Sequence, residues 1–125
     1  MYRNKIKQEE RFMTYDEHLK VRIKVIEDTF EILDDHIDVF GKSLNINYFF
    51  FSDKADKIDS LGVELLKMGY YLEFETIKDE NRRYVVTGHT DEMEISLKSI
   101  VEWIIIMCDL GLRFDCQFDG WELNK

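Results

Sequence analysis

The spacing of apolar residues changes at Gly41, and this change constrains the fold more than any other feature of the chain. Before Gly41, apolar side chains recur every three or four residues over a long stretch, which is the spacing of one face of an α-helix. After Gly41, short runs with strand-like alternation are separated by two helical runs. The sequence therefore predicts one long helix followed by a unit of mixed helix and sheet.

The first pattern predicts a helix from Thr14 or Tyr15 to Phe40. Its apolar positions form a seam with nearly heptad spacing: Phe12, Tyr15, Leu19, Ile23, Ile26, Phe30, Leu33, Ile37 and Phe40. The chain has no proline, the strongest helix breaker. Such a helix would be about 39 Å long, more than the roughly 25 Å width of a domain of about 80 residues. We expect it to break near Asp34 and Asp35 or to extend past the domain, with its seam packed on its own domain or in a homodimer.

The second pattern predicts four strands and two helices in the order β-α-β-β-α-β. We expect strands at residues 46–51, 70–77, 82–88 and 112–119, a helix at 55–68 capped by Ser52 or Asp53, and a helix from Met93 or Ser96 to Leu110 closed by Gly111. This order predicts an α+β, ferredoxin-like sandwich with an added long N-terminal helix. It divides the chain into a helical extension, residues 1–44, and a domain, residues 45–125. Two helices on one face of the sheet would leave the other face free.

Net charge limits the classes of partner. The 125 residues include 17 basic and 26 acidic side chains, for a net charge of −9. Residues 45–125 hold nine basic and 16 acidic side chains, and so −7 of that total. A negative surface disfavours direct binding to nucleic acid, which needs basic groups against phosphates, and suits a basic protein partner. No stretch is long and apolar enough for a membrane span, so we expect a cytoplasmic protein.

Motifs for catalysis, metal binding or cofactor binding are missing from the sequence. His18 and His36 are expected to be solvated on the long helix, and Cys108 and Cys116 to be buried free thiols. His89, beside Asp91 and Glu92, is the one group considered as a general base, without a nucleophile placed for it. We therefore predict no enzyme, no catalytic residue, no metal and no cofactor, with an enzyme built around His89 as a weaker alternative.

Three segments, in this order, carry a resemblance to a known family. They are YFFFSDKA at 48–55, KMGY at 67–70 and FDGWE at 118–122. Over roughly residues 45–122 the chain resembles the regulator of ribonuclease E activity B family, the RraB-like ribonuclease E inhibitors. The resemblance implies a ferredoxin-like domain that regulates an endoribonuclease and RNA turnover by protein contact, without catalysis. Phe118 replaces the Tyr of the family's Tyr-Asp-Gly-Trp element.

The function predicted from these observations is a non-enzymatic, acidic protein-binding module whose partner is a ribonuclease. The alternative is an immunity-type protein that neutralises a cognate nuclease toxin, since opposite charges speed encounter with a basic nuclease. Seven residues of the outward sheet row and its end are candidate contacts: Phe49, Phe51, Glu73, Glu75, Asp115, Asp119 and Trp121. Trp is a frequent interface anchor, but Trp121 could instead close the core, with Gly120 forming a turn and Asp119 bonding to its amides.

Overall fold

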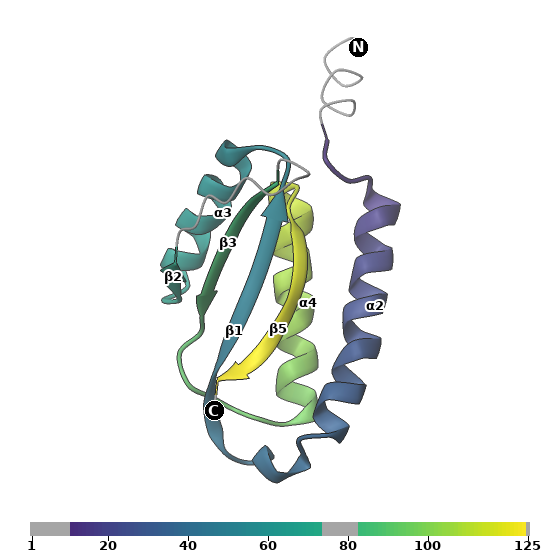
Figure 1. Cartoon of the computed structure of the whole chain (residues 1–125), viewed down its shortest axis with the longest axis vertical. Coiled ribbons are helices and arrows are strands. Elements are labelled where there is room, and N and C mark those ends of the chain that lie inside the picture. The colour runs from purple at the N-terminus through teal and green to yellow at the C-terminus, as the bar shows by residue number, and fades with distance from the viewer. Residues whose placement is uncertain (1–10, 74–82, 125) are drawn as a thin grey trace.

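A computed structural model of the chain describes residues 11–73 and 83–124, and these residues form helices packed on an antiparallel sheet (Figure 1). The described elements are α2 (Tyr15–Asp34), the 3-10 helix η1 (Ile37–Val39), β1 (Ser43–Ser52), α3 (Ala55–Lys67), β2 (Tyr71–Glu73), β3 (Tyr84–His89), β4 (Met93–Glu94), α4 (Leu97–Phe114) and β5 (Gln117–Asn124). The predicted α+β class is confirmed. Within the described residues, no helix has the length and apolar character needed to cross a membrane.

The sheet is centred on β1, its longest strand. β1 pairs with β3 on one side and with β5 on the other, and β2 pairs with β3. The short β4 pairs with Ser43 and Leu44, before the point where β3 begins its pairing with β1. All of these pairs are antiparallel. β2 and β5 therefore lie at opposite edges of the sheet.

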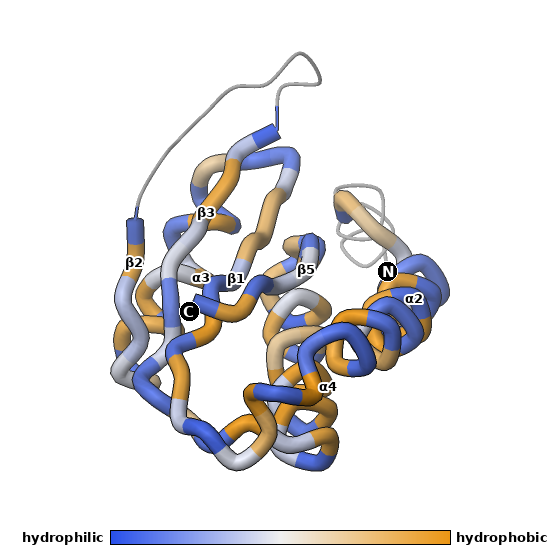
Figure 2. The backbone as a smooth tube through the Cα atoms, turned by 60° about the horizontal axis from the view of Figure 1, so that its bottom comes forward, coloured by the Kyte–Doolittle hydropathy of each residue, from blue (hydrophilic) through white to orange (hydrophobic). Residues whose placement is uncertain are grey.

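The core lies between the sheet and the helices behind it. Alternation along β1 buries Ile46, Tyr48 and Phe50 completely, whereas Phe49 faces the other side and is half-buried. Figure 1 shows α3 and α4 behind the sheet, with α2 beside α4. Hydrophobic residues recur along α4 (Figure 2), and its buried residues are Ile100, Trp103, Ile104, Met107, Cys108, Leu110 and Gly111, as expected of a helix covered from two directions. The core cluster includes residues of the sheet, α4 and α2, so α2 is part of the same core.

The long N-terminal helix breaks where the sequence predicted. A capping box between Thr14 and Glu17 starts α2, and the helix ends at Asp34 before η1. The prediction of which side is buried was partly wrong. Residues His18, Val25, Thr29 and Leu33 are buried, while Tyr15, Ile23 and Phe30 of the expected seam are 59%, 57% and 50% exposed. A helix with 3.6 residues per turn drifts away from a strict heptad line, so a single face cannot bury the whole seam.

The end of α4 also differs from the prediction. Gly111 does not close the helix, which continues to Phe114 and ends at Asp115 in the left-handed conformation (φ 57°). Gly111 is inside the helix, where an added Cβ would lie 2.6 Å from the carbonyl oxygen of Cys116. The expected alternation over residues 112–119 therefore fails up to Cys116, because the chain is still helical or turning there. At the start of α3, Lys54 takes the N-cap position in place of Ser52 or Asp53 and forms no side-chain cap.

Candidate protein-binding surface

The structure separates the predicted contact residues into exposed and covered groups. Glu73 and Asp119 are exposed and Phe49 is half-buried. Phe51, Asp115 and Trp121 are at most 7% exposed, and Glu75 lies outside the described residues. Phe51 is covered from two directions. The ring of Phe12 packs on it, with 5.8 Å between the ring centroids, and the Arg83 guanidinium lies 4.4 Å from the centroid of the Phe51 ring. The exposed members belong to the outer side of the sheet.

Asp115 is not on the outward strand row, and this prediction was wrong. Its carboxylate accepts hydrogen bonds from the backbone N–H groups of Phe12 and Met13 and forms an ion pair with Lys57 Nζ at 2.7 Å. Burial by itself raises the pKa of Asp115, but the bonds from Lys57 and the two amides outweigh it and hold that pKa below its usual value. Asp115 therefore anchors the segment before α2 to the end of α4.

His18 belongs to the same cluster, so its prediction as a solvated residue was also wrong. It is 6% exposed, and its Nε2 lies 3.5 Å from Asp115 Oδ1 without a well-formed hydrogen bond. Burial lowers the pKa of His18, with Asp115 acting in the opposite direction. His36 is half-buried, and its Nδ1 lies 2.7 Å from the Ile32 carbonyl oxygen. Both histidines are thus at least partly buried and lie next to protein oxygen atoms.

A β-bulge in β5 determines where the Asp-Gly-Trp element points. The register shifts between Tyr48 and Phe50 of β1, so Asp119 and Gly120 together oppose Phe49. Gly120 has φ 109°, which suits glycine. The extra residue lets Phe118 and Trp121, three positions apart, both reach the core at 2% and 5% exposure. Trp121 Nε1 donates to Thr29 Oγ1 at 3.0 Å, and so its interpretation as a core residue is confirmed.

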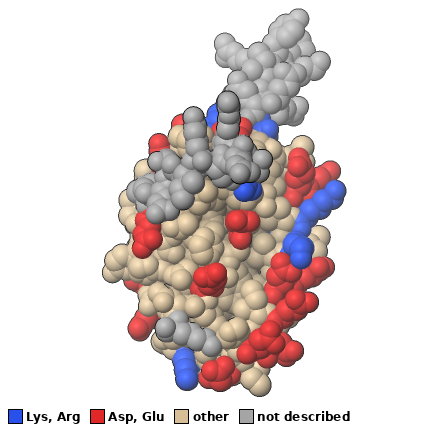
Figure 3. Space-filling model, viewed as in Figure 1, with Lys and Arg blue, Asp and Glu red and all other residues tan. Residues whose placement is uncertain are grey.

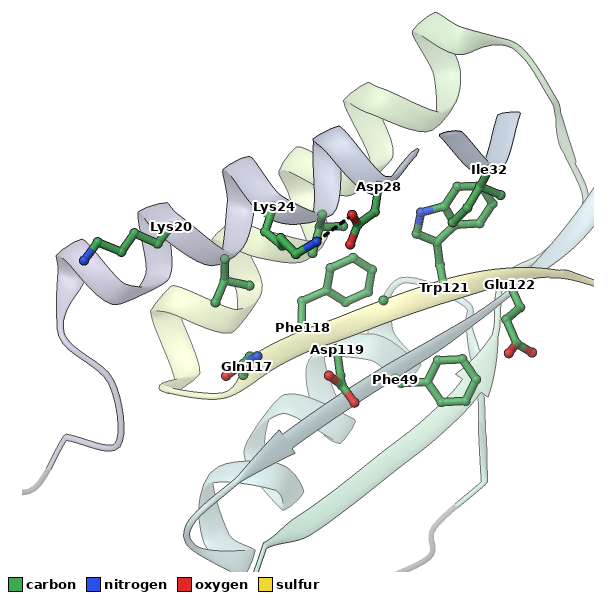
Figure 4. Close-up of a pocket in the computed structure, with 13 residues that line it drawn as sticks. Lys20, Lys24, Asp28, Ile32, Phe49, Gln117, Phe118, Asp119, Trp121 and Glu122 are labelled. Atoms are coloured by element: carbon green, nitrogen blue, oxygen red, sulfur yellow. Dashed lines mark hydrogen bonds and ion pairs between the residues drawn. The ribbon is translucent and has the colours of Figure 1, made fainter. Parts of the chain in front are cut away.

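A groove with a volume of about 880 Å³ separates α2 from β5. We name it the α2–β5 groove. It is lined by Lys20, Val21, Lys24, Val25, Asp28, Ile32, Phe49, Gln117, Phe118, Asp119, Gly120, Trp121 and Glu122. In Figure 4, Phe118 and Trp121 point toward α2, whereas Asp119 and Glu122 point to the opposite side of β5, together with Phe49. One side of β5 is thus apolar and the other carries carboxylates.

The C-terminal half of α2 carries an acidic segment that the sequence analysis did not single out. Between Val25 and Gly41 the chain has no Lys or Arg but six carboxylates, Glu27, Asp28, Glu31, Asp34, Asp35 and Asp38. Figure 3 shows acidic side chains gathered along the lower part of α2. A helix C-terminus favours cations, so these charges oppose the α2 dipole. The sequence itself indicates this acidic segment, because the stretch between Val25 and Gly41 contains no Lys or Arg.

The residues considered for chemistry lie apart from this surface. The His89 ring stacks on Tyr71, with 4.5 Å between ring centroids. Within residues 83–124, no hydrogen bond joins His89 to Asp91 or Glu92. Cys108 and Cys116 are free and buried, as predicted, and burial raises their pKa values to about 11 and about 12. Such thiols are protonated and unreactive at neutral pH.

Comparison with known proteins identifies the family. The model of the family described as "Regulator of ribonuclease activity B" (RraB) matches residues 24–123, which is 100 of the 125 residues. The match extends into α2, beyond the segments that carried the resemblance. No curated protein matches the chain. Since the family model covers most of the chain, from the middle of α2 to the end of β5, the chain belongs to the RraB family.

Proposed function

We propose that this protein regulates an endoribonuclease of the ribonuclease E type by direct protein contact in the cytoplasm, without catalysing a reaction itself. The observation that carries this proposal is the family match over residues 24–123. The net charge of −9 supports it, because an enzyme that binds RNA presents basic surface to its substrate. An acidic regulator is attracted to that surface.

The acidic segment of α2 is our candidate for the contact. Glu31, Asp34, Asp35 and Asp38 are exposed, and no basic residue occupies the last turn of the helix. Placing like charges together at the negative end of a helix dipole costs stability. A basic partner would offset that cost on binding, and Asp119 and Glu122 of β5 extend the negative surface.

The test measures binding to purified ribonuclease E from the same genome by biolayer interferometry, together with cleavage of a model RNA. We expect binding that weakens with salt and slower cleavage. In the double variant Asp34→Lys with Asp35→Lys, binding should fall at least tenfold while the free energy of unfolding rises, since the dipole is then favoured. A fall in binding therefore cannot be ascribed to unfolding.

A matched control changes the net charge equally at another place. Asp59 on α3 and Glu94 on β4 are both exposed, and their double change to Lys should leave binding within about threefold. Equal losses in both double variants would mean that net charge alone is measured. Absence of ribonuclease binding at low salt would overturn the proposed function.

Two alternatives receive less support. The family match gives no support to an immunity-type protein, since the family is described by ribonuclease regulation. As for an enzyme built around His89, no carboxylate among the residues that the structure describes forms a hydrogen bond with this side chain, and Tyr71 stacks on its ring. These observations favour regulation by protein contact over both alternatives.

We infer a ferredoxin-like arrangement for the sheet and its two covering helices. It is supported by the order β2-β3-β1-β5, the antiparallel pairing of these neighbours, and the position of α3 and α4 on one face (Figure 1). The division into residues 1–44 and 45–125 stays a prediction. Its test is whether residues 45–125 fold without α2, which supplies Val25, Thr29 and Leu33 to the core.

We also propose a homodimer through the outer side of α2. Ile23 and Phe30 are 57% and 50% exposed there, and Ile105 and Ile106 of the adjacent α4 are 37% and 48% exposed. Since α2 packs against α4, the four side chains belong to one helical layer. Covering exposed aliphatic and aromatic side chains with another protein surface removes them from water, which favours association.

A further inference from the structure

The strand β5 forms an edge of the sheet, and the α2–β5 groove runs beside it. Within the described residues, β1 is the strand that pairs with β5, and the groove opens on the other side of β5, toward α2. An edge strand presents unpaired backbone N–H and C=O groups to any extended chain that lies next to it. A groove between an edge strand and a helix is a common site for strand addition by a peptide.

The groove continues along the strand. A second hollow of about 520 Å³ is lined by Ile32, His36, Trp121, Glu122 and Leu123. It shares Ile32, Trp121 and Glu122 with the α2–β5 groove, so the two hollows adjoin. Together they reach from Gln117 to Leu123, almost the whole of β5 (Gln117–Asn124).

The bulge leaves the second half of β5 regular. Trp121 to Asn124 pair in continuous register with Tyr48 to Asn45 of β1. The disturbed part is at Asp119 and Gly120, where an added Cβ on Gly120 would meet nothing within 4 Å. An added strand could therefore pair with residues 121–124 and pass through open space at the bulge.

The two sides of the groove call for different side chains. Successive residues of an added strand would point alternately to the two faces of the sheet. One face meets Phe118 and Trp121, and the other meets Asp119 and Glu122 (Figure 4). Apolar residues fit the first face, and Lys or Arg fits the second. Burial raises the pKa of Asp119, with Arg83 opposing it, so a partly desolvated carboxylate there gains from a cation.

The distribution of charge along the groove also determines the orientation in which a basic peptide would bind. Lys20 lies at the end near Gln117, and Lys24, farther along α2, is paired with Asp28 at 2.9 Å (Figure 4). The opposite end, near His36 and Leu123, adjoins the acidic segment of α2. A basic peptide should therefore place its cations toward the Glu122 end.

We propose that the α2–β5 groove binds an extended segment of a partner protein, with alternating apolar and basic residues, as an additional strand on β5. This inference does not depend on which protein supplies the segment. It concerns a binding site separate from the acidic segment of α2, which we proposed above as the contact with a ribonuclease.

The test selects a phage-displayed library of random dodecapeptides on the full chain and measures the dissociation constants of the selected synthetic peptides by fluorescence anisotropy. We expect enrichment of alternating apolar and basic residues. Amide hydrogen exchange should show new protection at residues 121–124. Selection of no peptide, or protection confined to β2 or to the outer side of α2, would overturn the proposal.

Two matched comparisons separate strand addition from simple charge attraction. Glu122→Lys should weaken peptide binding at least tenfold, whereas Glu73→Lys, an exposed carboxylate on the opposite edge strand β2, should change it less than threefold. Alternate amides of the peptide can be N-methylated in two ways, at the odd-numbered or at the even-numbered positions. Only one of these two sets of amides donates hydrogen bonds to β5, so methylation of that set should abolish binding and methylation of the other set should not. Equal effects of both protein variants, or no effect of N-methylation in either register, would contradict strand addition. The ribonuclease assay described above is independent, so either proposal can fail alone.

Discussion

At the scale of single residues, Asp115 joins parts of the chain that are distant in sequence. Its carboxylate bonds to the Phe12 and Met13 amides, 103 and 102 positions away, and to Lys57 of α3. Its backbone is left-handed, which Asp and Asn tolerate better than most residues. Sequence alternation placed it on the outer face because local spacing contains no information about partners so far away.

The first prediction concerns Asp115. Asp115→Ala removes an acceptor for two amides, leaves Lys57 without this carboxylate, and puts Ala in a left-handed backbone, so we expect the free energy of unfolding to fall by about 3 kcal/mol or more. Asp115→Asn keeps an acceptor and the tolerated backbone and should cost about half as much. Urea denaturation followed by circular dichroism measures both. Equal costs in the two variants would show that the loss comes from the carboxylate charge alone, and that neither the acceptor nor the left-handed backbone contributes.

The second prediction concerns His18. Because burial lowers its pKa in the folded protein, the unfolded chain takes up a proton near the ordinary value of 6.5 while the folded chain does not. Stability is therefore present above pH 6.5 and falls as the pH drops toward the lowered value, by at most about 1.4 kcal/mol per pH unit. The groups facing His18 are Asp115, Arg11 and Glu17. Urea denaturation at pH 7.5 and 5.5 should show this fall.

The His18→Gln variant is the control for this pH dependence. Glutamine does not titrate, so the difference in stability between pH 7.5 and 5.5 should shrink in the variant. All other titratable groups are the same in the two proteins, which keeps the comparison specific to His18. An unchanged difference would assign the pH dependence to other groups.

At the scale of elements, α2 is held to the sheet by one buried polar contact as well as by apolar packing. Thr29 is fully buried; its hydroxyl donates to the Val25 carbonyl at 2.7 Å and accepts from Trp121 Nε1 at 3.0 Å. The indole N–H would otherwise be a buried donor without an acceptor. This contact fixes which side of α2 faces the core, and it leaves Ile23 and Phe30 outside.

The third prediction tests this contact. Thr29→Val keeps the shape but leaves the Trp121 indole N–H unpaired, so we expect a loss of about 2 kcal/mol. Thr29→Ser keeps the hydroxyl and should cost about 0.8 kcal/mol for one methyl group. The chain has two tryptophans, so exchange of the Trp121 indole proton can be followed by NMR. Slow exchange in the Val variant would contradict the assigned bond.

At the scale of the whole molecule, the exposed surface contains two features that a monomer does not need. One is the acidic segment at the end of α2, and the other is the apolar layer formed by Ile23, Phe30, Ile105 and Ile106. Both involve α2, the element that separates this chain from a plain sheet-and-two-helix unit. A partner protein and a second copy can therefore occupy different sides of the same helix.

The fourth prediction concerns oligomeric state. Light scattering of the full chain at high concentration should give about 30 kDa, twice the 15.1 kDa of the chain. The variant Ile23→Lys with Phe30→Lys should give the monomer mass, because charges on this layer disfavour its burial. The matched variant Val63→Lys with Leu66→Lys changes two α3 side chains of similar exposure and should stay dimeric. A monomer for the unaltered chain would contradict the homodimer.

The sequence by itself determined the order of the main helices and strands, where α2, α3 and α4 begin, the break near Asp34, the acidic balance and the resemblance to the family. These depend on local spacing, on capping and turn residues, and on motifs that lie within short segments. The tertiary structure alone decided that Asp115 and His18 are buried together, that α2 turns Thr29 inward, and that the bulge carries Trp121 to the core while Asp119 and Glu122 stay outside. Burial is decided by neighbours up to about 100 positions away in the chain, and a period of 2 or 3.6 residues cannot encode those neighbours.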